Sequence, residues 1–276
     1  MFRYSQRELL VTLRGGNNLR SWRFPGRWMS DSELDCLRNT IKKITLSRVG
    51  ALPEYGIYLP GRSPYKDRII TVVYAGDESR PIAFSAMIHC PIRIEKRVHH
   101  VLHLGLVIIS RSSPGRNLLF LIYFFPIAHY WATRSFSGFW VSSVSKEPSI
   151  IGAVADYFGN VYPHYLRKTR PTRTKKEIAR RFVSEYGHEF GIGPGGVLNE
   201  KTFIIQASCR GTSEVLRSSF EKSAKYAIHR CNEFCRESLN YERGDELLQI
   251  GNLNARTALH AGLRWLRALW RYRGHM

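Results

Sequence analysis

The spacing of apolar residues in the first half of the chain predicts one helix followed by three strands. In residues 30–44, leucine and isoleucine recur at spacings of three and four, which places them on one helical face. Residues 67–76 are rich in β-branched side chains and predict a strand, and a polar turn leads to its antiparallel partner at 81–94. Residues 98–110 are nearly all apolar, as expected of a buried central strand.

The middle of the chain predicts a second helix, a further strand and a third helix. An apolar run over residues 117–125 predicts the second helix, and we expect Pro126 to end it because proline lacks a backbone N–H. Residues 138–145 predict a strand. Pro148 then suits the first turn of the third helix, where its missing N–H has no partner to lose.

The last third of the chain has weaker signals. Residues 168–176 indicate a basic linker, 187–200 a glycine-rich loop, and 202–207 a short strand. Residues 213–240 and 254–273 predict helices. The whole order predicts a mixed α/β fold with a mostly antiparallel central sheet, flanking helices and a helical C-terminal extension.

These elements divide the chain into three predicted parts. Residues 1–29 form a basic N-terminal segment and residues 30–170 form the folded core. Residues 171–276 hold the basic linker's end, the glycine-rich loop, the final strand and the helical extension. A chain of 276 residues is long enough to bury a full core.

The net charge of the chain limits the classes of molecule that it is expected to bind. A formal net charge of +20 favours polyanions: nucleic acid, an anionic membrane face, or a phosphate-rich small molecule. The most apolar stretch, residues 118–132, contains Pro126 and His129 and is too short to span a bilayer. We see no signal peptide. We expect a cytoplasmic protein, with peripheral attachment to a membrane as the alternative.

Five cysteines are too few and too scattered for the disulfide framework of a secreted domain, which favours a reducing compartment. Cys231 and Cys235 lie four apart on a predicted helix, with His229 close by. This trio could supply part of a metal site, but no second group of ligands completes it. Buried thiols on a helix face are the more ordinary interpretation, and we expect no metal.

The polar joint between the long strand and the second helix is the strongest candidate site. Residues 111–117 are Arg-Ser-Ser-Pro-Gly-Arg-Asn, without one large apolar side chain. A short loop at a helix start presents free backbone N–H groups and the positive end of the helix dipole, which together bind anions. Gly115 permits close approach of the anion, and Arg111 and Arg116 add charge. A surface turn with solvated arginines remains the alternative.

The order of elements and this loop together resemble the GNAT superfamily of acyl-CoA-dependent N-acyltransferases. In that family the loop reads Arg/Gln-x-x-Gly-x-Gly/Ala, and its amides bind the CoA pyrophosphate. Gly115 matches the first glycine, whereas Ser112 replaces the Arg or Gln and Asn117 replaces the second small residue. The resemblance covers residues 30–165 and implies that the loop binds CoA. Its residues are Arg111, Ser112, Ser113, Pro114, Gly115, Arg116 and Asn117.

A second motif extends the resemblance into the third helix. The family often shows Asn-x-x-Ala-x-x-x-Tyr followed by Phe, and Ala153, Tyr157 and Phe158 match it here, with Ile150 in place of Asn. In many relatives the tyrosine protonates the departing CoA thiolate. The resemblance therefore implies that Tyr157 is the general acid. An ordinary packing role for this tyrosine is the alternative.

The resemblance also places the thioester on the central strand. In the family a backbone N–H of that strand orients the thioester carbonyl, which implies cofactor contacts at Leu106, Val107 and Ile108. His103 lies on the same strand and has a suitable intrinsic pKa for a general base. A histidine satisfied in the core is the competing interpretation. Rivals for the base stand slightly upstream: Glu95, His99 and His100.

Residues 254–273 predict a sharply amphipathic helix. Its basic face carries four arginines and one histidine at spacings of three and four, and its opposite face is apolar. This composition suits an anionic membrane interface or nucleic-acid phosphates. A helix that packs its apolar face on the folded core and solvates its arginines is the third interpretation.

The sequence thus predicts an enzyme that transfers an acyl group from acetyl-CoA, a longer acyl-CoA or an acyl carrier protein to an amine acceptor. The acceptor is not legible in the sequence. A catalytically inactive GNAT-like fold that binds nucleic acid or a membrane surface is the alternative. Nucleic acid is disfavoured because aromatic residues are not interleaved with the basic run.

Overall fold

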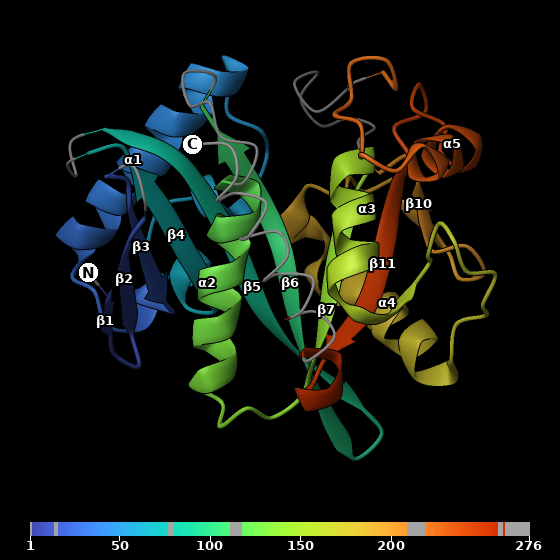
Figure 1. Cartoon of the computed structure of the whole chain (residues 1–276), viewed down its shortest axis with the longest axis horizontal. Helices are drawn as coiled ribbons and strands as arrows, with labels where there is room; N and C mark the ends of the chain where they lie inside the picture. The colour runs from blue at the N-terminus through green and yellow to red at the C-terminus, as the bar shows by residue number, and fades with distance from the viewer. Residues whose placement is uncertain are drawn as a thin grey trace. The chain divides into compact units, whose positions relative to one another are not determined.

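The structure is a computed structural model that describes residues 2–13, 16–76, 80–110, 118–208, 219–258 and 262. Its contacts divide the chain into two compact units (Figure 1). The first comprises Met1–His89 and Leu104–Ser137, and the second comprises Cys90–His103 and Gly138–Met276. Two long strands, β5 and β6, contribute residues to both units.

The first unit contains strands in the order β1-β2-β3-β4-β5-β6 with two α-helices. The strands are β1 (Phe2–Tyr4), β2 (Glu8–Thr12), β3 (Asn18–Arg23), β4 (Arg68–Tyr74), β5 (Pro81–Ile94) and β6 (Arg97–Ile109). The helices are α1 (Asp31–Val49) and α2 (Leu118–Ala132), with 3-10 turns η1 (Pro25–Arg27), η2 (Gly56–Tyr58) and η3 (Ser63–Tyr65). The predicted first helix and the three strands after it are confirmed.

Two helices cover opposite faces of the sheet in the first unit. Every residue of β4 is buried, although side chains of a strand alternate between its two faces. Ile70 and Val72 pack in a cluster with the apolar face of α1. Val73 packs in another cluster with Leu118 and Ile122 of α2. The continuous apolar sequence of β4 therefore follows from burial on both faces.

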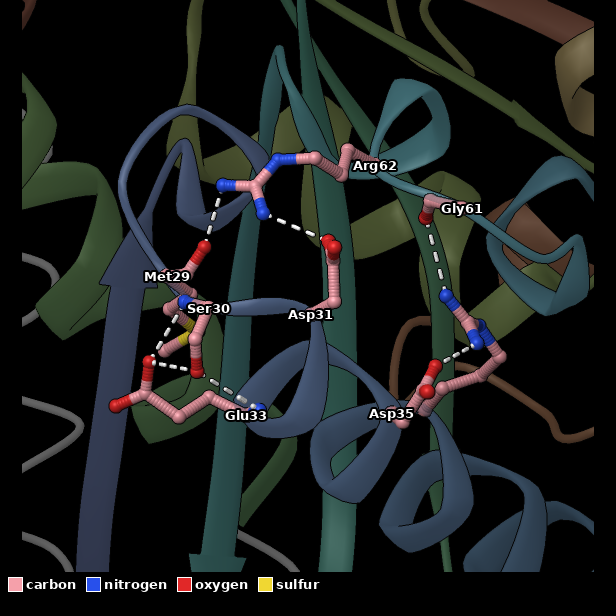
Figure 2. A network of polar contacts seen from close by, with 8 residues as sticks. Met29, Ser30, Asp31, Glu33, Asp35, Gly61 and Arg62 are labelled. Atoms are coloured by element: carbon pink, nitrogen blue, oxygen red, sulfur yellow. Dashed lines mark hydrogen bonds and ion pairs between the residues drawn. The ribbon is translucent and has the colours of Figure 1, made fainter.

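A polar network fixes the start of α1 (Figure 2). The Ser30 hydroxyl accepts a hydrogen bond from the Glu33 backbone N–H at 3.3 Å, and the Glu33 carboxylate accepts from the Ser30 N–H at 2.7 Å. This is a capping box. Its hydrogen bonds from the Ser30 backbone and hydroxyl lower the pKa of Glu33. Ser30 is therefore the N-cap of α1.

Arginines tie the loop after α1 to the same helix end. Arg62 donates to the Asp31 carboxylate at 2.7 Å and also to the Met29 carbonyl (Figure 2). Arg38 pairs with Asp35 and donates to the Gly61 carbonyl at 3.0 Å. Because these bonds join residues on the loop to residues at the start of the helix, they hold the loop against the first two turns of α1.

The second helix does not end at Pro126 as predicted. Helix α2 continues through Pro126 to Ala132. Proline lacks the N–H that would bond to the carbonyl four residues earlier, which is that of Ile122. The buried Ser85 hydroxyl of β5 donates to that Ile122 carbonyl at 3.2 Å. The prediction was wrong because a tertiary hydrogen bond satisfies the group that proline leaves open.

This substitution of one donor for another is testable. We expect Ser85→Ala to lower the free energy of unfolding by about 1–3 kcal/mol, because it removes the hydrogen bond that the Ile122 carbonyl accepts from Ser85. Pro126→Ala returns the N–H to the helix, so the cost of Ser85→Ala should shrink in that background. Urea unfolding of the four proteins in this double-mutant cycle measures the coupling. An equal cost in both backgrounds would show that the serine serves some other purpose.

The second unit contains strands in the order β6-β7-β11-β10-β9, and β8 pairs with β11 off this path. The new strands are β7 (Phe139–Ser145), β8 (Gly159–Tyr162), β9 (Val197–Asn199), β10 (Ile204–Gln206) and β11 (Glu246–Leu253). The helices are α3 (Pro148–Tyr157), α4 (Arg173–Tyr186) and α5 (His229–Ser238), with the 3-10 turn η4 (Gly187–Phe190). Strands β6 and β7 pair in parallel between Val101↔Trp140 and His103↔Ser142, whereas β11 is antiparallel to β7.

The mixed α/β class with a mostly antiparallel sheet is confirmed, but several elements differ from the prediction. Residues 2–23 hold three strands in addition to their basic charge. Helix α4 begins inside the predicted linker 168–176, where the Thr172 hydroxyl caps it by accepting from the Lys175 N–H at 3.3 Å. Residues 219–228 are not helical, so α5 is the helical part of the predicted helix 213–240 among the described residues, and 213–218 lie outside them. The predicted helix 254–273 is described as helical at 255–258 and 262, and its remainder lies outside the described residues.

Each unit ends its strand order in a short strand. Strand β1 has three residues and pairs with β2, and strand β9 has three residues and pairs with β10. Both pairs are antiparallel.

Candidate functional site

Strand β6 carries a backbone irregularity at the point where the sequence predicts thioester contacts. Gly105 has φ +58°, and a Cβ there would lie 2.0 Å from the Ala86 carbonyl oxygen of β5. An L-residue is strained at this φ, and no side chain fits so close to a backbone oxygen. A glycine with positive φ inside a strand locally redirects the backbone, as in a β-bulge. Only glycine satisfies both demands at this position.

The three residues after Gly105 are the predicted cofactor contacts. Leu106 and Ile108 pack in the cluster that contains the apolar face of α1, and Val107 packs in the cluster of α2. Ile108 is buried, while Leu106 and Val107 are half-buried. Half-buried apolar side chains on a central strand leave surface that an acyl or pantetheine chain can cover.

Tyr123 of α2 faces the same part of the strand, and sequence reasoning missed it. Its hydroxyl donates to the Gly105 carbonyl at 3.5 Å, the long limit of a hydrogen bond. Burial raises the pKa of Tyr123, which keeps this phenol protonated. No sequence motif signals this role, because the contact depends on how α2 packs across β6.

The predicted pyrophosphate loop, Arg111, Ser112, Ser113, Pro114, Gly115, Arg116 and Asn117, lies outside the described residues. Both of its ends are described. The Ser110 N–H donates to the Ile82 carbonyl at 2.8 Å, so pairing with β5 continues to the residue before the loop. Helix α2 begins at Leu118, the residue after it. The loop therefore joins the end of a paired strand to the first turn of a helix.

His103 lies in the interior of the second unit. It is 1 % exposed, and its Nδ1 lies 3.0 Å from the Ser142 hydroxyl on the paired strand β7. Its ring contacts Phe182 and Phe190 at centroid distances of 4.8 Å and 4.0 Å. These contacts give His103 the surroundings of a satisfied core histidine and give its predicted role as a base no support.

The rivals to His103 occupy the β5–β6 hairpin. Glu95 forms the turn with φ +53° and pairs with Arg173 at 3.5 Å, and 77 % of its side chain is exposed. His99 accepts a hydrogen bond at Nδ1 from the Trp140 indole at 3.2 Å. His100 is half-buried. Exposure of Glu95 to solvent leaves it no special environment for proton transfer, and the described contacts single out none of the three.

Tyr157 is the last residue of α3 and is half-buried. The residue before it, Asp156, accepts two phenolic hydrogen bonds: one from Tyr226 at 2.6 Å and one from Tyr165 at 3.0 Å. Burial, followed by the hydrogen bond and the charge of Asp156, raises the pKa of Tyr226. The Asp156 carboxylate therefore ties the end of α3 to two phenols that donate to it, and these bonds hold the backbone beside Tyr157, the proposed acid.

Gly152 makes this anchoring possible. A Cβ at Gly152 would lie 2.2 Å from Cδ1 of the Tyr226 ring, so any larger residue would displace that ring. Tyr226 could then no longer reach Asp156 from the same position. Sequence reasoning noticed the tyrosine motif of this helix but missed its glycine, whose partner lies far away in the chain.

The cysteine pair on α5 is buried. Cys231 and Cys235 are both free, and the Cys231 thiol donates to the Pro148 carbonyl at 3.6 Å. A hydrogen bond with Cys231, followed by burial, raises the pKa of the Cys235 thiol. Protonated, buried thiols are weak metal ligands and weak nucleophiles. In the described part of the chain, no group of three His, Cys, Asp or Glu side chains could hold a metal ion.

The described elements reproduce the order on which the family resemblance rests. Helix α1, the β4–β5 pair, β6, α2, β7 and α3 follow one another, and β7 is parallel to β6. The fold resembles that of the GNAT superfamily. No protein-family model and no curated protein matches the chain.

Solved structures supply the remaining comparisons. A ribosomal-protein-S5-alanine acetyltransferase from Vibrio fischeri has 10% sequence identity and a TM-score of 0.31, over 48% of this chain and 73% of its own. A mutant of the AtaT toxin, bound to the C-terminus of the antitoxin AtaR and to acetyl-CoA, has 13% identity and a TM-score of 0.24, over 27% and 49%. A tetramutant of the BH1408 protein from Bacillus halodurans has 14% identity and a TM-score of 0.24, over 42% and 76%.

One structural observation concerns the possible association with a membrane. No helix within the described ranges has both the length and the apolar content that crossing a bilayer requires. The amphipathic face predicted over residues 254–273 falls largely outside those ranges.

Proposed function

We propose that this protein is an N-acyltransferase that takes its acyl group from an acyl-CoA. The observation that carries the proposal is the passage from the paired end of β6 at Ser110 through residues 111–117 to the start of α2 at Leu118. We infer that residues 111–117 form a loop whose backbone N–H groups bind an anion together with the dipole of the helix. The family resemblance assigns that anion as the CoA pyrophosphate.

The strand that leads into the loop suits the rest of the co-substrate. Gly105 has a positive φ within β6, and we infer that a backbone N–H beside this irregularity binds the thioester carbonyl. Leu106 and Val107 offer half-buried apolar surface. These features support acetyl-CoA or a longer acyl-CoA as donor, and a donor bound to an acyl carrier protein belongs to the same chemistry.

In the proposed reaction a neutral amine attacks the thioester carbonyl carbon and a C–N bond forms. The oxygen of the resulting tetrahedral intermediate is stabilised by the backbone donor on β6. The C–S bond then breaks, and Tyr157 supplies the proton that the departing thiolate takes. The amine loses its extra proton to water or to a base that we do not assign. The products are an amide and free CoA.

The amine acceptor is not specified by any described group. We propose that the enzyme is cytoplasmic. We also propose that it acts at an anionic membrane surface, to which the basic residues of 254–273 would attach it. No described contact favours the alternative of an inactive fold that binds nucleic acid.

A thermal-shift screen tests the proposal. A ligand that binds only the native state raises the unfolding midpoint. We expect acetyl-CoA and a long-chain acyl-CoA to raise it by several degrees at a hundredfold excess over Kd, which corresponds to about 2.7 kcal/mol. Short RNA and DNA serve as the contrasting ligands. A shift with nucleic acid and none with any acyl-CoA would replace the proposed function by the nucleic-acid alternative.

A further inference from the structure

The second unit contains a cavity of about 460 Å³ that the proposed reaction does not use. Three segments form its walls: the chain after β8, the turn between β9 and β10, and one side of α5. Figure 1 shows α5 and β10 next to each other within this unit. A volume in this range is typical of sites for small molecules.

The rim of the cavity is strongly basic. Four cationic side chains line it: Arg167, Lys168, Lys201 and Arg230. All four residues are exposed, and none forms an ion pair with another described residue. No aspartate or glutamate is among the lining residues. Four positive charges around one opening, with no acidic side chain among the described lining residues, favour an anionic ligand.

The floor of the cavity is aromatic and aliphatic. Tyr162, Tyr165 and Leu247 are buried there, and Phe234 is half-buried. At the edge of the cavity, the side chain of Leu166 is 52 % exposed. An apolar floor beneath a cationic rim suits a ligand with a flat or aliphatic body and an anionic end.

The walls that carry the cations are held by their own hydrogen bonds. His164 accepts from the Leu166 N–H at 3.1 Å, and the buried Gln249 of β11 donates to the Pro163 carbonyl at 3.1 Å. Asn199 accepts from the N–H groups of Lys201 and Thr202 at 3.0 Å and 3.3 Å. Because the backbone on both sides is fixed, a ligand would have to order only side chains, which lowers the cost of binding.

From the volume, the basic rim and the aromatic floor together, we propose that this cavity binds a mononucleotide. The base would cover the floor near Phe234, and the phosphates would meet Arg167 and Arg230 at the rim. Guanidinium groups bind phosphate with paired, charge-assisted hydrogen bonds. Hydroxyls of Thr169, Thr202 and Ser238 in the lining can add polar contacts to the sugar.

Titration calorimetry with ADP, adenosine and inorganic phosphate tests the proposal on the full chain. We expect ADP to bind at least tenfold more tightly than either adenosine or phosphate, because each of these keeps only one half of the ligand. Raising the salt concentration should weaken ADP binding, since the contacts at the rim are exposed to solvent. Equal affinity for ADP and phosphate would contradict a nucleotide site.

Paired arginine variants locate the binding. Arg167→Gln with Arg230→Gln should weaken ADP binding at least tenfold, and Arg167→Lys with Arg230→Lys should recover part of the loss. The matched control, Arg48→Gln with Arg236→Gln, removes two exposed arginines that do not line the cavity, and Arg236 lies on the same helix as Arg230. If the control weakens binding as much as the cavity variant, the proposal is wrong and only net charge matters.

Two further outcomes separate this site from other binders. ADP affinity should persist in Gly115→Asp, because none of the described residues that line the cavity belongs to the predicted pyrophosphate loop. Loss of ADP binding in that variant would assign the signal to the loop and overturn the proposal. A short RNA that binds more tightly than ADP and is weakened by the cavity variant would replace the mononucleotide by a nucleic acid. Failure of acyl-CoA to bind while ADP binds would affect the proposed function alone.

Discussion

Gly115→Asp should abolish CoA binding while the protein stays folded. The substitution places a side chain and a negative charge where the proposed pyrophosphate approaches the backbone, and like charges at close range repel strongly. We expect the affinity to fall at least a hundredfold by titration calorimetry. The unfolding midpoint without ligand should change little, since Gly115 lies between the described end of β6 at Ile109 and the described start of α2 at Leu118.

Gly195→Asp provides the matched control. A Cβ at Gly195 meets nothing within 4 Å, so this variant adds the same charge at a glycine with free space around it. It should bind CoA like the unmodified protein. Unchanged CoA affinity in Gly115→Asp would remove the loop from the proposed site.

Tyr157→Phe should lower turnover by about ten- to a thousandfold. The phenyl ring keeps the packing at the end of α3, so stability should be nearly unchanged. Because Tyr157 is proposed to protonate the leaving thiolate, the defect should shrink with an aryl thioester donor, whose thiolate leaves without a proton. Release of free thiol from each donor measures both rates.

Tyr186→Phe controls for the loss of a phenol as such. Tyr186 is half-buried in the same unit and donates to the Pro91 carbonyl at 3.3 Å. This variant should keep full turnover with both donors. A Tyr157→Phe defect that is the same for alkyl and aryl thioesters would indicate packing rather than proton transfer.

Periodicity predicted α1, β4, β5 and β6 of the first unit because their signals are local, whereas it missed the three strands of residues 2–23. The capping box at Ser30 and the buried runs of β5 and β6 are complete in the sequence itself. Pro126 shows where local reasoning ends, since the donor that allows the helix to continue is Ser85 on another element. Strand β11 was missed for a different reason. A glycine and polar residues interrupt its apolar run at 246–253, so the sequence shows no clear strand pattern there.

In the candidate site too, residues within local motifs could be predicted, whereas those that depend on tertiary contacts could not. Tyr157 is predicted through its motif, and Asp156 is the residue before it in the sequence. The phenols that bond to Asp156 come from positions 165 and 226, and no spacing rule connects them. Tyr123 was missed for the same reason, because its contact with Gly105 depends on tertiary packing. His103 shows the reverse, a suggestive position in the sequence whose surroundings are those of the core.

The short strands at the two ends of the strand orders bear on how this protein behaves at high concentration. A strand with one unpaired side is a template on which another chain can add by backbone hydrogen bonding. Strands β1 and β9 present three residues each, which is about half of a typical strand. An incoming strand could therefore form only a few backbone hydrogen bonds with either of them. Growth of aggregates from these two edges should therefore be slow, even though Val197 of β9 is exposed.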